Sequence, residues 1–318
     1  MEDREVIECV AAAAGVPSGA AAGARVSSLG GKQGLLVCRV ELGCGQSFVF
    51  KVVKESARRE VALAELLSRI VPDAVPRVVA AEQDCKRGLY WLVCEDVGTR
   101  RLADEPLVEW HVATAVTLAR LQLASIDHLS AICEAGAPVV DCARWEEIGL
   151  RLLEALDDSE NAAGSDKAAV EDVIWSVTSM ASDASACPLA LVHGDLHAGN
   201  VALRAPDYES GASSVRLLDW GSAYVGAAFL GLEELLWPAA RFLRTPDQWG
   251  RVRAAYLREW ARLLGKPGPL EKAVAACAAL VRLELLDEAV RRPHQFDAFA
   301  AASIQRRLIE AFEAWRRA

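Results

Sequence analysis

Hydrophobic positions change their period about a third of the way along the chain. Segments 26–40, 47–53 and 89–94 have the alternation or short apolar runs of strands, and the first of them reads as two strands around a glycine turn at 30–34. A short helix precedes these strands, and segment 56–70 has helical periodicity. We therefore expect a small antiparallel β-sheet lobe with one main helix over residues 1–94.

Helical spacing dominates from about residue 107. Two short apolar runs, 189–192 and 215–218, interrupt it, and each is followed by a charged cluster. Segments 161–166 and 206–214 are expected to be loops. The pattern predicts an α+β protein whose strand-rich lobe is joined by a hinge at 95–98 to a large, mostly helical lobe over 99–318. The expected helices are 107–125, 145–155, 168–181, 231–243, 247–264, 270–291 and 296–315.

Composition narrows the class of protein. The chain has 318 residues, of which 53% are hydrophobic and 25% charged, which excludes disorder and fibrous repeats. A formal net charge of −9 argues against nucleic acid as a partner, because such binding relies on neutralising phosphates. The chain has no apolar run of membrane-spanning length and begins with an acidic segment, so we expect no membrane partner and a cytoplasmic location. Nine scattered cysteines without a C-x-x-C pair predict free thiols.

The densest chemical signal is the octapeptide His-Gly-Asp-Leu-His-Ala-Gly-Asn at 193–200. Asp195 and the later Asp219 each come just after a short strand-like run, and Asn200 stands five residues beyond Asp195. A strand–loop–strand arrangement would bring these three side chains to one edge. Two carboxylates and an amide oxygen are hard ligands that suit Mg²⁺, which usually takes substrate phosphates as further ligands.

A cation and a phosphate cradle should complete a phosphoryl-transfer site. Lys51 is a single charge in an apolar strand, and taken alone it fits an edge lysine reaching water better than a functional group. On the following helix, however, Glu60 lies on the apolar row and needs a buried partner, for which Lys51 is the obvious residue. The turn with Gly30, Gly31 and Gly34 offers backbone N–H groups to a phosphate, although most such turns only join strands.

These motifs resemble the aminoglycoside phosphotransferase and choline kinase-like family, which has a two-lobed protein kinase-like fold. The octapeptide at 193–200, followed by Asp-Trp-Gly at 219–221, is highly specific, and the lobe order extends the resemblance over nearly the whole chain. The resemblance implies that ATP or GTP and Mg²⁺ are cofactors. It assigns the catalytic base to Asp195, the metal to Asn200 and Asp219, the phosphates to Lys51 steadied by Glu60, and the adenine edge to the backbone of Cys94 and Asp96.

The sequence also departs from the family pattern. Gly231 stands where the family often has an Asp, and Glu233 is the expected substitute. A metal-dependent hydrolase built on His193, Asp195 and His197 is a rival interpretation, but it leaves Lys51, Glu60 and Asn200 without a role. A silent nucleotide-binding module is a second rival. A protein kinase is disfavoured because no Ala-Pro-Glu stretch closes an activation segment.

The acceptor is expected to be a small hydroxylated molecule bound by the helical lobe. An antibiotic such as an aminoglycoside is the first hypothesis, with choline, homoserine or a sugar as the alternative. Carboxylates and tryptophans could bind a cationic acceptor, although a solvated face balanced by Arg291 and Arg292, together with core tryptophans, explains them at least as well. The residues concerned are Glu233, Glu234, Glu284, Asp287, Glu288, Asp297, Trp110, Trp220 and Trp237.

Overall fold

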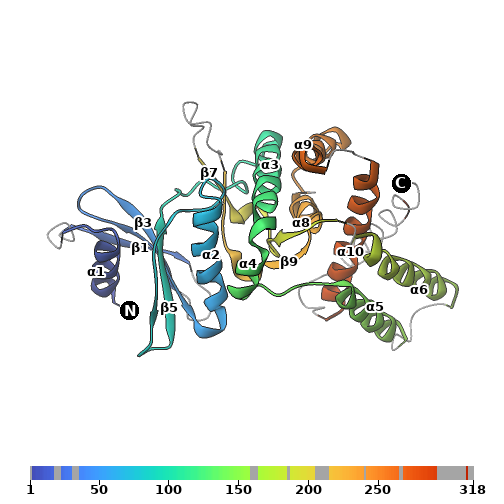
Figure 1. The fold of residues 1–318 in the computed structure, drawn as a ribbon, viewed down its shortest axis with the longest axis horizontal. Helices are drawn as coiled ribbons and strands as arrows, with labels where there is room; N and C mark the ends of the chain where they lie inside the picture. The colour runs from blue at the N-terminus through green and yellow to red at the C-terminus, as the bar shows by residue number, and fades with distance from the viewer. Residues whose placement is uncertain are drawn as a thin grey trace.

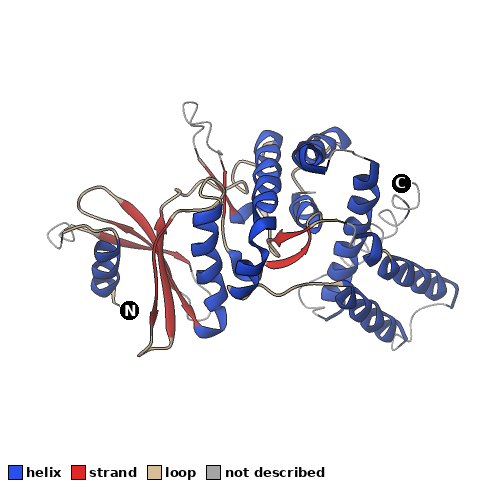
Figure 2. Cartoon of the chain, in the orientation of Figure 1, coloured by secondary structure: helices blue, strands red, loops and turns tan. Residues whose placement is uncertain are grey.

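The protein consists of a five-stranded antiparallel sheet followed by a helical part with two small sheets (Figures 1 and 2). This is seen in a computed structural model that describes residues 2–17, 23–30, 36–157, 164–184, 187–204, 215–239, 241–264, 268–291 and 313. The expected α+β organisation is thereby confirmed. The boundaries of the lobes stay a prediction, although the last strand of the large sheet ends at Glu95, where the hinge was expected.

The large sheet has the strand order β1-β2-β3-β5-β4. Helix α1 (Asp3–Ala13) covers one face, and helix α2 (Arg58–Ile70), preceded by a 3₁₀ turn at Glu55–Ala57, covers the other (Figure 1). Edge strand β4, which ends in polar residues, was not among the strands predicted from the sequence pattern. The strands are β1 (Arg25–Gly30), β2 (Leu36–Glu41), β3 (Ser47–Lys54), β4 (Val78–Asp84) and β5 (Leu89–Glu95).

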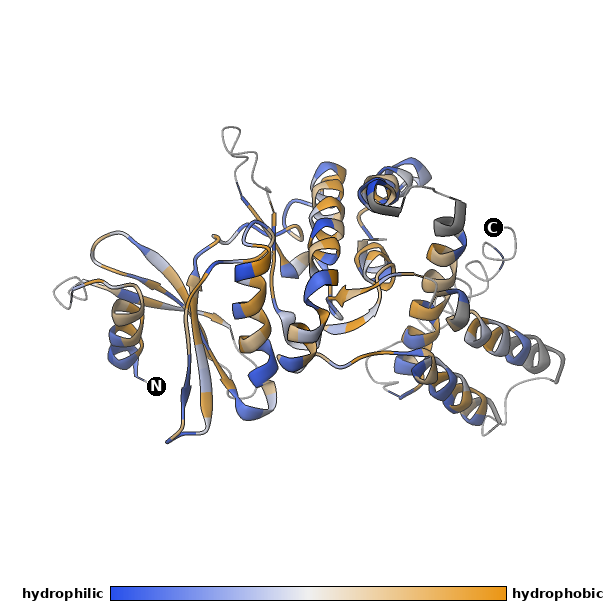
Figure 3. Ribbon diagram, in the orientation of Figure 1, coloured by the Kyte–Doolittle hydropathy of each residue, from blue (hydrophilic) through white to orange (hydrophobic). Residues whose placement is uncertain are grey.

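Alternation along β3 divides its side chains between the two faces of the sheet. Phe48, Phe50 and Val52 pack in the cluster that contains α1, whereas Val53 packs in the cluster that contains Val61 of α2. Lys51 therefore shares the α2 face, as the sequence pattern predicts. Figure 3 shows that the strands of the large sheet carry both hydrophobic and hydrophilic residues.

The helical part is built around one large core that also takes in Leu63 and Leu67 of α2. Strand β6 pairs with β9, and β7 pairs with β8. The helices are α3 (Val108–Ser125), α4 (Leu129–Glu134), α5 (Cys142–Asp157), α6 (Gly164–Ser179), α7 (Ala181–Ala184), α8 (Leu230–Ala239), α9 (Pro246–Leu264) and α10 (Gly268–Arg291), and a 3₁₀ turn at Ile126–His128 follows α3. The strands are β6 (Leu189–Val192), β7 (Val201–Leu203), β8 (Val215–Leu217) and β9 (Tyr224–Ala227).

The expected helix 231–243 is shorter in the structure because a new helix starts soon after it. Thr245 and Gln248 form a capping box: the Gln248 side chain accepts from the Thr245 N–H at 3.2 Å, and the Thr245 hydroxyl accepts from the Gln248 N–H at 3.3 Å.

Strand β9 was not predicted from the sequence. The expected helix 296–315 and loop 206–214 lie outside the described residues.

Two class-level expectations can be compared with the structure. All nine cysteines are free thiols, as predicted. In the described part of the chain, no helix combines the length and the apolar character needed to span a lipid bilayer.

Candidate active site

Two loops that carry the octapeptide and the Asp-Trp-Gly stretch lie side by side. His193 donates from Nε2 to the Leu218 carbonyl at 2.8 Å, and the Leu218 N–H donates to the Asn200 carbonyl at 2.9 Å. The first loop joins β6 to β7 and the second joins β8 to β9, and these strands pair as β6 with β9 and β7 with β8. The structure thus brings Asp195, Asn200 and Asp219 to one region, as the strand–loop–strand pattern predicts.

His193 holds these loops rather than binding a ligand. Its side chain is fully buried and packs on the Trp220 ring with centroids 4.5 Å apart. Nδ1 accepts from the Asp195 N–H at 3.3 Å, so both ring nitrogens are engaged by backbone groups. Burial lowers the pKa of His193 to about 4, which keeps the ring neutral. A hydrolase that uses His193 as a metal ligand does not fit this geometry.

Gly194 is required by the close approach of the two loops. Its φ is +80°, and a Cβ placed there would lie 2.2 Å from the Ser222 carbonyl oxygen. Neither the backbone conformation nor the space admits another residue. The next residue, Asp195, is exposed, and its peptide carbonyl accepts from the Asn200 side-chain amide at 2.9 Å. Partial desolvation raises the pKa of Asp195 although the neighbouring His197 lowers it, and the charges of Asp219 and Glu288 add to the rise, which suits a proton acceptor.

Lys51 forms the ion pair with Glu60 that the sequence predicts. Its Nζ bonds the Glu60 carboxylate and lies 3.5 Å from Oδ1 of Asp219. Burial alone would lower the pKa of Lys51, but Glu60 and Asp219 outweigh it, so its pKa is raised and it remains an ammonium. Burial raises the pKa of Glu60 despite the lysine. The neighbouring Arg59 donates to the Gly221 carbonyl and ties α2 to the loop after Asp219.

Asp219 and Asn200 offer oxygen atoms that fit a divalent cation. The Asp219 side chain is half exposed and its backbone is left-handed at φ 65°, the one positive φ of a non-glycine residue in the described ranges. Such strain concentrates at functional sites. Asn200 commits its amide nitrogen to the Asp195 carbonyl, which leaves its amide oxygen for a ligand. A carboxylate and an amide oxygen are the donors that Mg²⁺ takes beside phosphates.

A cavity of about 290 Å³, here called the cleft cavity, lies between the large sheet and the two loops. Its walls include Lys51, Glu60, Asn200 and Asp219 from the predicted site, together with apolar residues of β2, β3 and β5. Cys94 lines the cavity, and its thiol lies 3.7 Å from the Val49 carbonyl. Burial raises the pKa of this thiol to about 12, so it is a neutral wall group.

The remaining predicted nucleotide-binding residues lie in different surroundings. The Asp96 carboxylate turns to Arg39, with contacts of 2.5 and 3.0 Å, to Ser47 at 2.7 Å and to the Gly98 N–H at 2.9 Å. Burial would raise the pKa of Asp96, but these bonds outweigh it and lower the pKa. Asp96 thus braces the connection between the lobes, and adenine recognition by its backbone stays a prediction. Gly30 ends β1 at φ +124°, whereas Gly31 and Gly34 lie outside the described residues.

A second cavity of about 520 Å³, here called the acidic pocket, lies on the other side of the loop. The loop contributes Asp195 and His197, whereas β9, α8 and α10 contribute Tyr224, Trp237 and three glutamates. The carboxylates lining the pocket are Asp195, Glu234, Glu284 and Glu288, and the guanidinium groups are Arg59 and Arg144. Four carboxylates against two guanidinium groups give the pocket an excess of negative charge.

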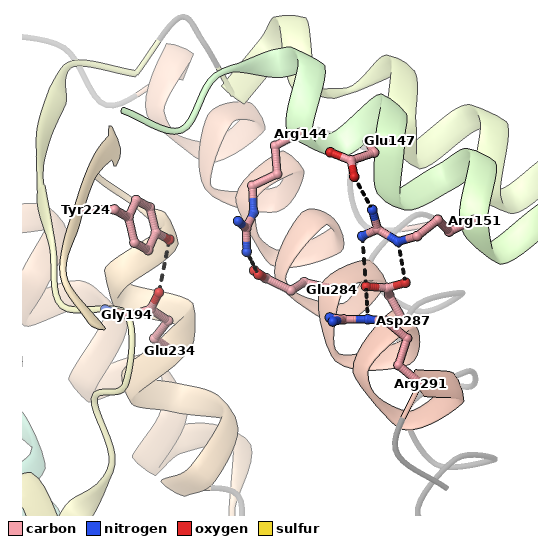
Figure 4. Close-up of polar contacts among 9 residues, drawn as sticks. All are labelled: Arg144, Glu147, Arg151, Gly194, Tyr224, Glu234, Glu284, Asp287 and Arg291. Carbon is pink, nitrogen blue, oxygen red and sulfur yellow. Dashed lines mark hydrogen bonds and ion pairs between the residues drawn. The ribbon is translucent and has the colours of Figure 1, made fainter. Parts of the chain in front are cut away.

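Ion pairs at the outer wall of the pocket connect α5 with α10 (Figure 4). Arg144 pairs with Glu284, and Arg151 pairs with Asp287 at 3.0 Å and with Glu147 at 2.6 Å. Asp287 is buried and also accepts from Arg291 at 2.9 Å. In the sequence interpretation, Arg291 and Arg292 balance Glu284 and Glu288. In the structure Arg144 pairs with Glu284 and Arg291 pairs with Asp287, whereas Arg292 lies outside the described residues.

The structure sorts the expected acceptor-binding residues. Glu234, Glu284, Glu288 and Trp237 line the acidic pocket, whereas Trp220 is buried beneath the loops and Trp110 packs against the core. Asp297 lies outside the described residues. Sequence analysis did not single out Arg59, Arg144 or Tyr224. Arg59 directly precedes Glu60, which was a usable signal, but no local pattern marks Arg144, because its partner Glu284 is 140 residues away.

The departure at position 231 has a steric explanation. A Cβ on Gly231 would lie 2.8 Å from the Gln122 amide nitrogen, which donates to the Ala228 carbonyl in a buried network. Glu233, the expected substitute for the missing Asp, is buried and pairs with Arg282 at 3.0 Å, so it links α8 to α10. The carboxylate that reaches the loop at residues 193–200, here called the catalytic loop because it carries the proposed base, is that of Glu234, whose Oε2 accepts from the Gly194 N–H at 2.9 Å.

Comparison with solved structures places the fold. The GDP complex of aminoglycoside 2'-phosphotransferase-IIIa has a TM-score of 0.62 at 16% identity, with 98% of this chain and 99% of that chain covered. Amicoumacin kinase hAmiN in complex with AMP-PNP, Ca²⁺ and Ami also has a TM-score of 0.62, at 13% identity, with 98% of this chain and 94% of that chain covered. The ethanolamine kinase of Plasmodium vivax has a TM-score of 0.56 at 12% identity, with 92% of this chain and 82% of that chain covered. The protein kinase-like fold expected from the sequence is thus confirmed.

Sequence comparison identifies the family directly. No curated protein matches the sequence as a relative. The family model described as the phosphotransferase enzyme family matches residues 26–272, a range that contains the Lys51–Glu60 pair, the octapeptide and Asp219. The protein is therefore a phosphotransferase, and the chain belongs to the phosphotransferase enzyme family.

Proposed function

We propose that the protein transfers the γ-phosphate of ATP or GTP, with Mg²⁺, to a hydroxyl group of a small molecule that carries an amine. An aminoglycoside antibiotic is the first acceptor to test, and inactivation of the drug by O-phosphorylation is the corresponding role. We place the reaction in the cytoplasm, where the nucleotide is available and the nine thiols stay reduced.

One observation carries the proposal: the loop between β6 and β7 contributes residues to two cavities with different linings. Asn200 and Asp219 line the cleft cavity beside Lys51, whereas Asp195 lines the acidic pocket. A nucleotide and its metal in the cleft cavity would therefore meet an acceptor hydroxyl in the acidic pocket at the catalytic loop. Phosphoryl transfer needs this arrangement, because the protein mainly positions the two substrates and neutralises charge.

Each residue then has a defined task. Lys51, held by Glu60, binds the phosphates, and Asp219 and Asn200 hold the cation. Mg²⁺ supplies neutralisation of the phosphate charge when bound. Asp195 accepts the proton of the acceptor hydroxyl, which makes that oxygen a better nucleophile, and its raised pKa favours this task.

The charge of the acidic pocket supports an amine-bearing acceptor. Its carboxylates exceed its guanidinium groups by two, and the Trp237 ring in the wall can contact a cation. The enzymes in the matching structures are named for aminoglycosides and ethanolamine, which are hydroxylated amines. A metabolic alcohol such as choline, homoserine or a sugar is the alternative, and of these the two that carry an ammonium group suit the pocket better.

The test compares two variants that should fail for different reasons. Asp195→Asn should bind Mg·ATP like the wild type, whereas Asp219→Asn should lose metal-dependent ATP binding; calorimetry with and without Mg²⁺ measures both. ADP release with kanamycin, choline, homoserine and uncharged sugars then identifies the acceptor. Equal Mg·ATP affinity in both variants would contradict the assignment of the cleft cavity. Turnover with uncharged acceptors alone would contradict the amine.

A further inference from the structure

Glu234 lies where the acidic pocket meets the catalytic loop. Its Oε2 accepts from the Gly194 N–H at 2.9 Å, and its Oε1 accepts from the Tyr224 hydroxyl at 3.0 Å (Figure 4). Gly194 immediately precedes Asp195, the proposed base. The carboxylate thus contacts both the loop that carries the base and the cavity proposed for the acceptor.

The charged surroundings of Glu234 are unusual for a carboxylate away from bulk water. No lysine, arginine or histidine among the described residues pairs with it. The pocket instead places further titratable groups around it, and burial, with help from Glu284 and Asp195, raises the pKa of Glu234 to about 8. The titratable and charged groups that share this pocket are Asp195 and His197 of the loop, Tyr224 of β9, Arg59 of α2, Arg144 of α5, and Glu284 and Glu288 of α10.

We propose that Glu234 is a positioning residue that couples acceptor binding to the catalytic loop: its carboxylate receives the ammonium group of the acceptor and thereby holds the loop through Gly194. This inference rests on the proposed function, because it assigns the amine of the acceptor to one side chain. An ammonium group beside Glu234 favours the ionised carboxylate, and the proton released passes to solvent.

Ionisation strengthens both hydrogen bonds that Glu234 accepts. A bond to a charged acceptor is about twice as strong as a neutral one. The Gly194 amide is therefore held most firmly when a cation occupies the pocket, and Asp195 is then fixed for proton transfer. An uncharged acceptor of the same size leaves Glu234 largely protonated at neutral pH and the loop more loosely held.

Glu234 is the α8 carboxylate that can contact both the loop and the acidic pocket. Position 231 is a glycine packed on Gln122, and Glu233 is turned away into its pair with Arg282. The anchoring carboxylate is supplied by Glu234, which lines the pocket. A carboxylate enclosed in the core could hold the loop, but it could not respond to the charge of the acceptor.

Hydrogen–deuterium exchange of the catalytic-loop peptide tests the inference in the full-length protein. At pH 9, above the pKa of Glu234, exchange of the Gly194 amide should be about tenfold faster in Glu234→Gln than in the wild type, because the charge-assisted bond is lost. Tyr224→Phe should show a smaller increase. The matched control is Glu284→Gln, which removes one negative charge from the same pocket but has no bond to Gly194; its loop should exchange within twofold of the wild type.

Kanamycin serves as the amine probe. It should slow exchange of the loop in the wild type and in Glu284→Gln, but not in Glu234→Gln. For phosphorylation, kcat/KM of the wild type should rise as pH increases through about 8, where free Glu234 ionises, and this rise should be absent in Glu234→Gln.

The outcomes separate this inference from the proposed function. Equal loop exchange in the wild type and Glu234→Gln, or equal protection of both by kanamycin, would overturn the inference. No protection of the wild type by kanamycin would also overturn the coupling to an amine. Absence of phosphorylation of any acceptor, with the exchange differences present, would instead contradict the proposed function and leave the loop contact established.

Discussion

The cleft cavity and the acidic pocket share one loop but are built by different means. The cleft cavity is lined by apolar side chains around a compact charged group, Lys51 with Glu60 and Asp219. The acidic pocket is lined by carboxylates and guanidinium groups from α2, α5, α8 and α10, far apart in the sequence. In the proposed function, the charged group of the cleft cavity binds the nucleotide phosphates, and the carboxylates of the helical part bind the acceptor.

Because different elements line the two cavities, substitutions should affect them separately. A change in the shared loop should damage both cavities, a change beside Lys51 should affect the nucleotide alone, and a change at the outer wall of the acidic pocket should affect the acceptor alone.

The free energy of unfolding of the protein should fall in acid, because His193 in the shared loop is buried in its neutral form. The folded protein keeps this ring neutral down to its pKa of about 4, whereas the unfolded chain binds a proton near pH 6.5. The neutral His193 ring therefore contributes fully to the free energy of unfolding above pH 6.5. This contribution is lost as the pH falls from 6.5 to 4, and at 1.36 kcal/mol per pH unit the loss is about 3 kcal/mol. Urea unfolding between pH 4 and 7 measures it. His193→Gln should flatten this pH dependence, whereas replacement of the exposed His128 should not.

Gly194→Ala should damage both cavities together. The added Cβ must move about 1 Å or more from the Ser222 carbonyl, and a misplacement of this size costs about 100-fold in rate. We expect kcat/KM to fall by about that factor for both substrates. Gly250→Ala is the control, because a Cβ there in α9 meets open space and should stabilise the helix by about 0.5–1 kcal/mol. Normal activity in Gly194→Ala would refute the close approach of the loops.

Lys51→Met should act on the cleft cavity alone. Loss of a charged donor to the phosphates should weaken ATP binding by about 10–100-fold. The KM of the acceptor should change less than twofold, and steady-state kinetics at varied concentrations of each substrate separates the two. Lys54→Met is the control, since Lys54 is exposed at the end of the same strand. An equal change in both KM values would argue against separate cavities.

Glu284→Gln should act on the acidic pocket alone and have the smallest effect. Glu284 already pairs with Arg144 and is partly exposed, so its loss should raise the KM of an amine acceptor by no more than about fivefold. ATP affinity should stay unchanged. Glu147→Gln, which removes an exposed carboxylate from the neighbouring ion pair, should alter neither value. A change in ATP affinity in Glu284→Gln would show that the pockets communicate.

The sequence allowed the cleft cavity to be predicted much better than the acidic pocket. The Lys51–Glu60 pair followed from local periodicity, because strand and helix periods place the two residues on facing surfaces. Asp195, Asn200 and Asp219 followed from their places after short strands. The roles of Gly30, Gly31, Gly34, Cys94 and Asp96 in nucleotide binding stay predictions.

The acidic pocket depends on contacts that local patterns do not reveal. Arg144 meets Glu284 across 140 residues, and Tyr224 lies on strand β9, which was not expected. The carboxylates of α8 were noticed, but helical spacing could not tell Glu233, buried against Arg282, from Glu234, which faces the loop. Tertiary packing of α8 on α3 and α10 decides between them.

A co-crystal structure with Mg²⁺ and AMP-PNP tests the central claim most directly. The account predicts that the phosphates lie in the cleft cavity against Lys51, that the metal is bound by Asn200 and Asp219, and that the γ-phosphate faces Asp195 across the loop. A nucleotide in the acidic pocket, or a metal held by Asp195 and His197 with Lys51 out of contact with phosphate, would contradict it.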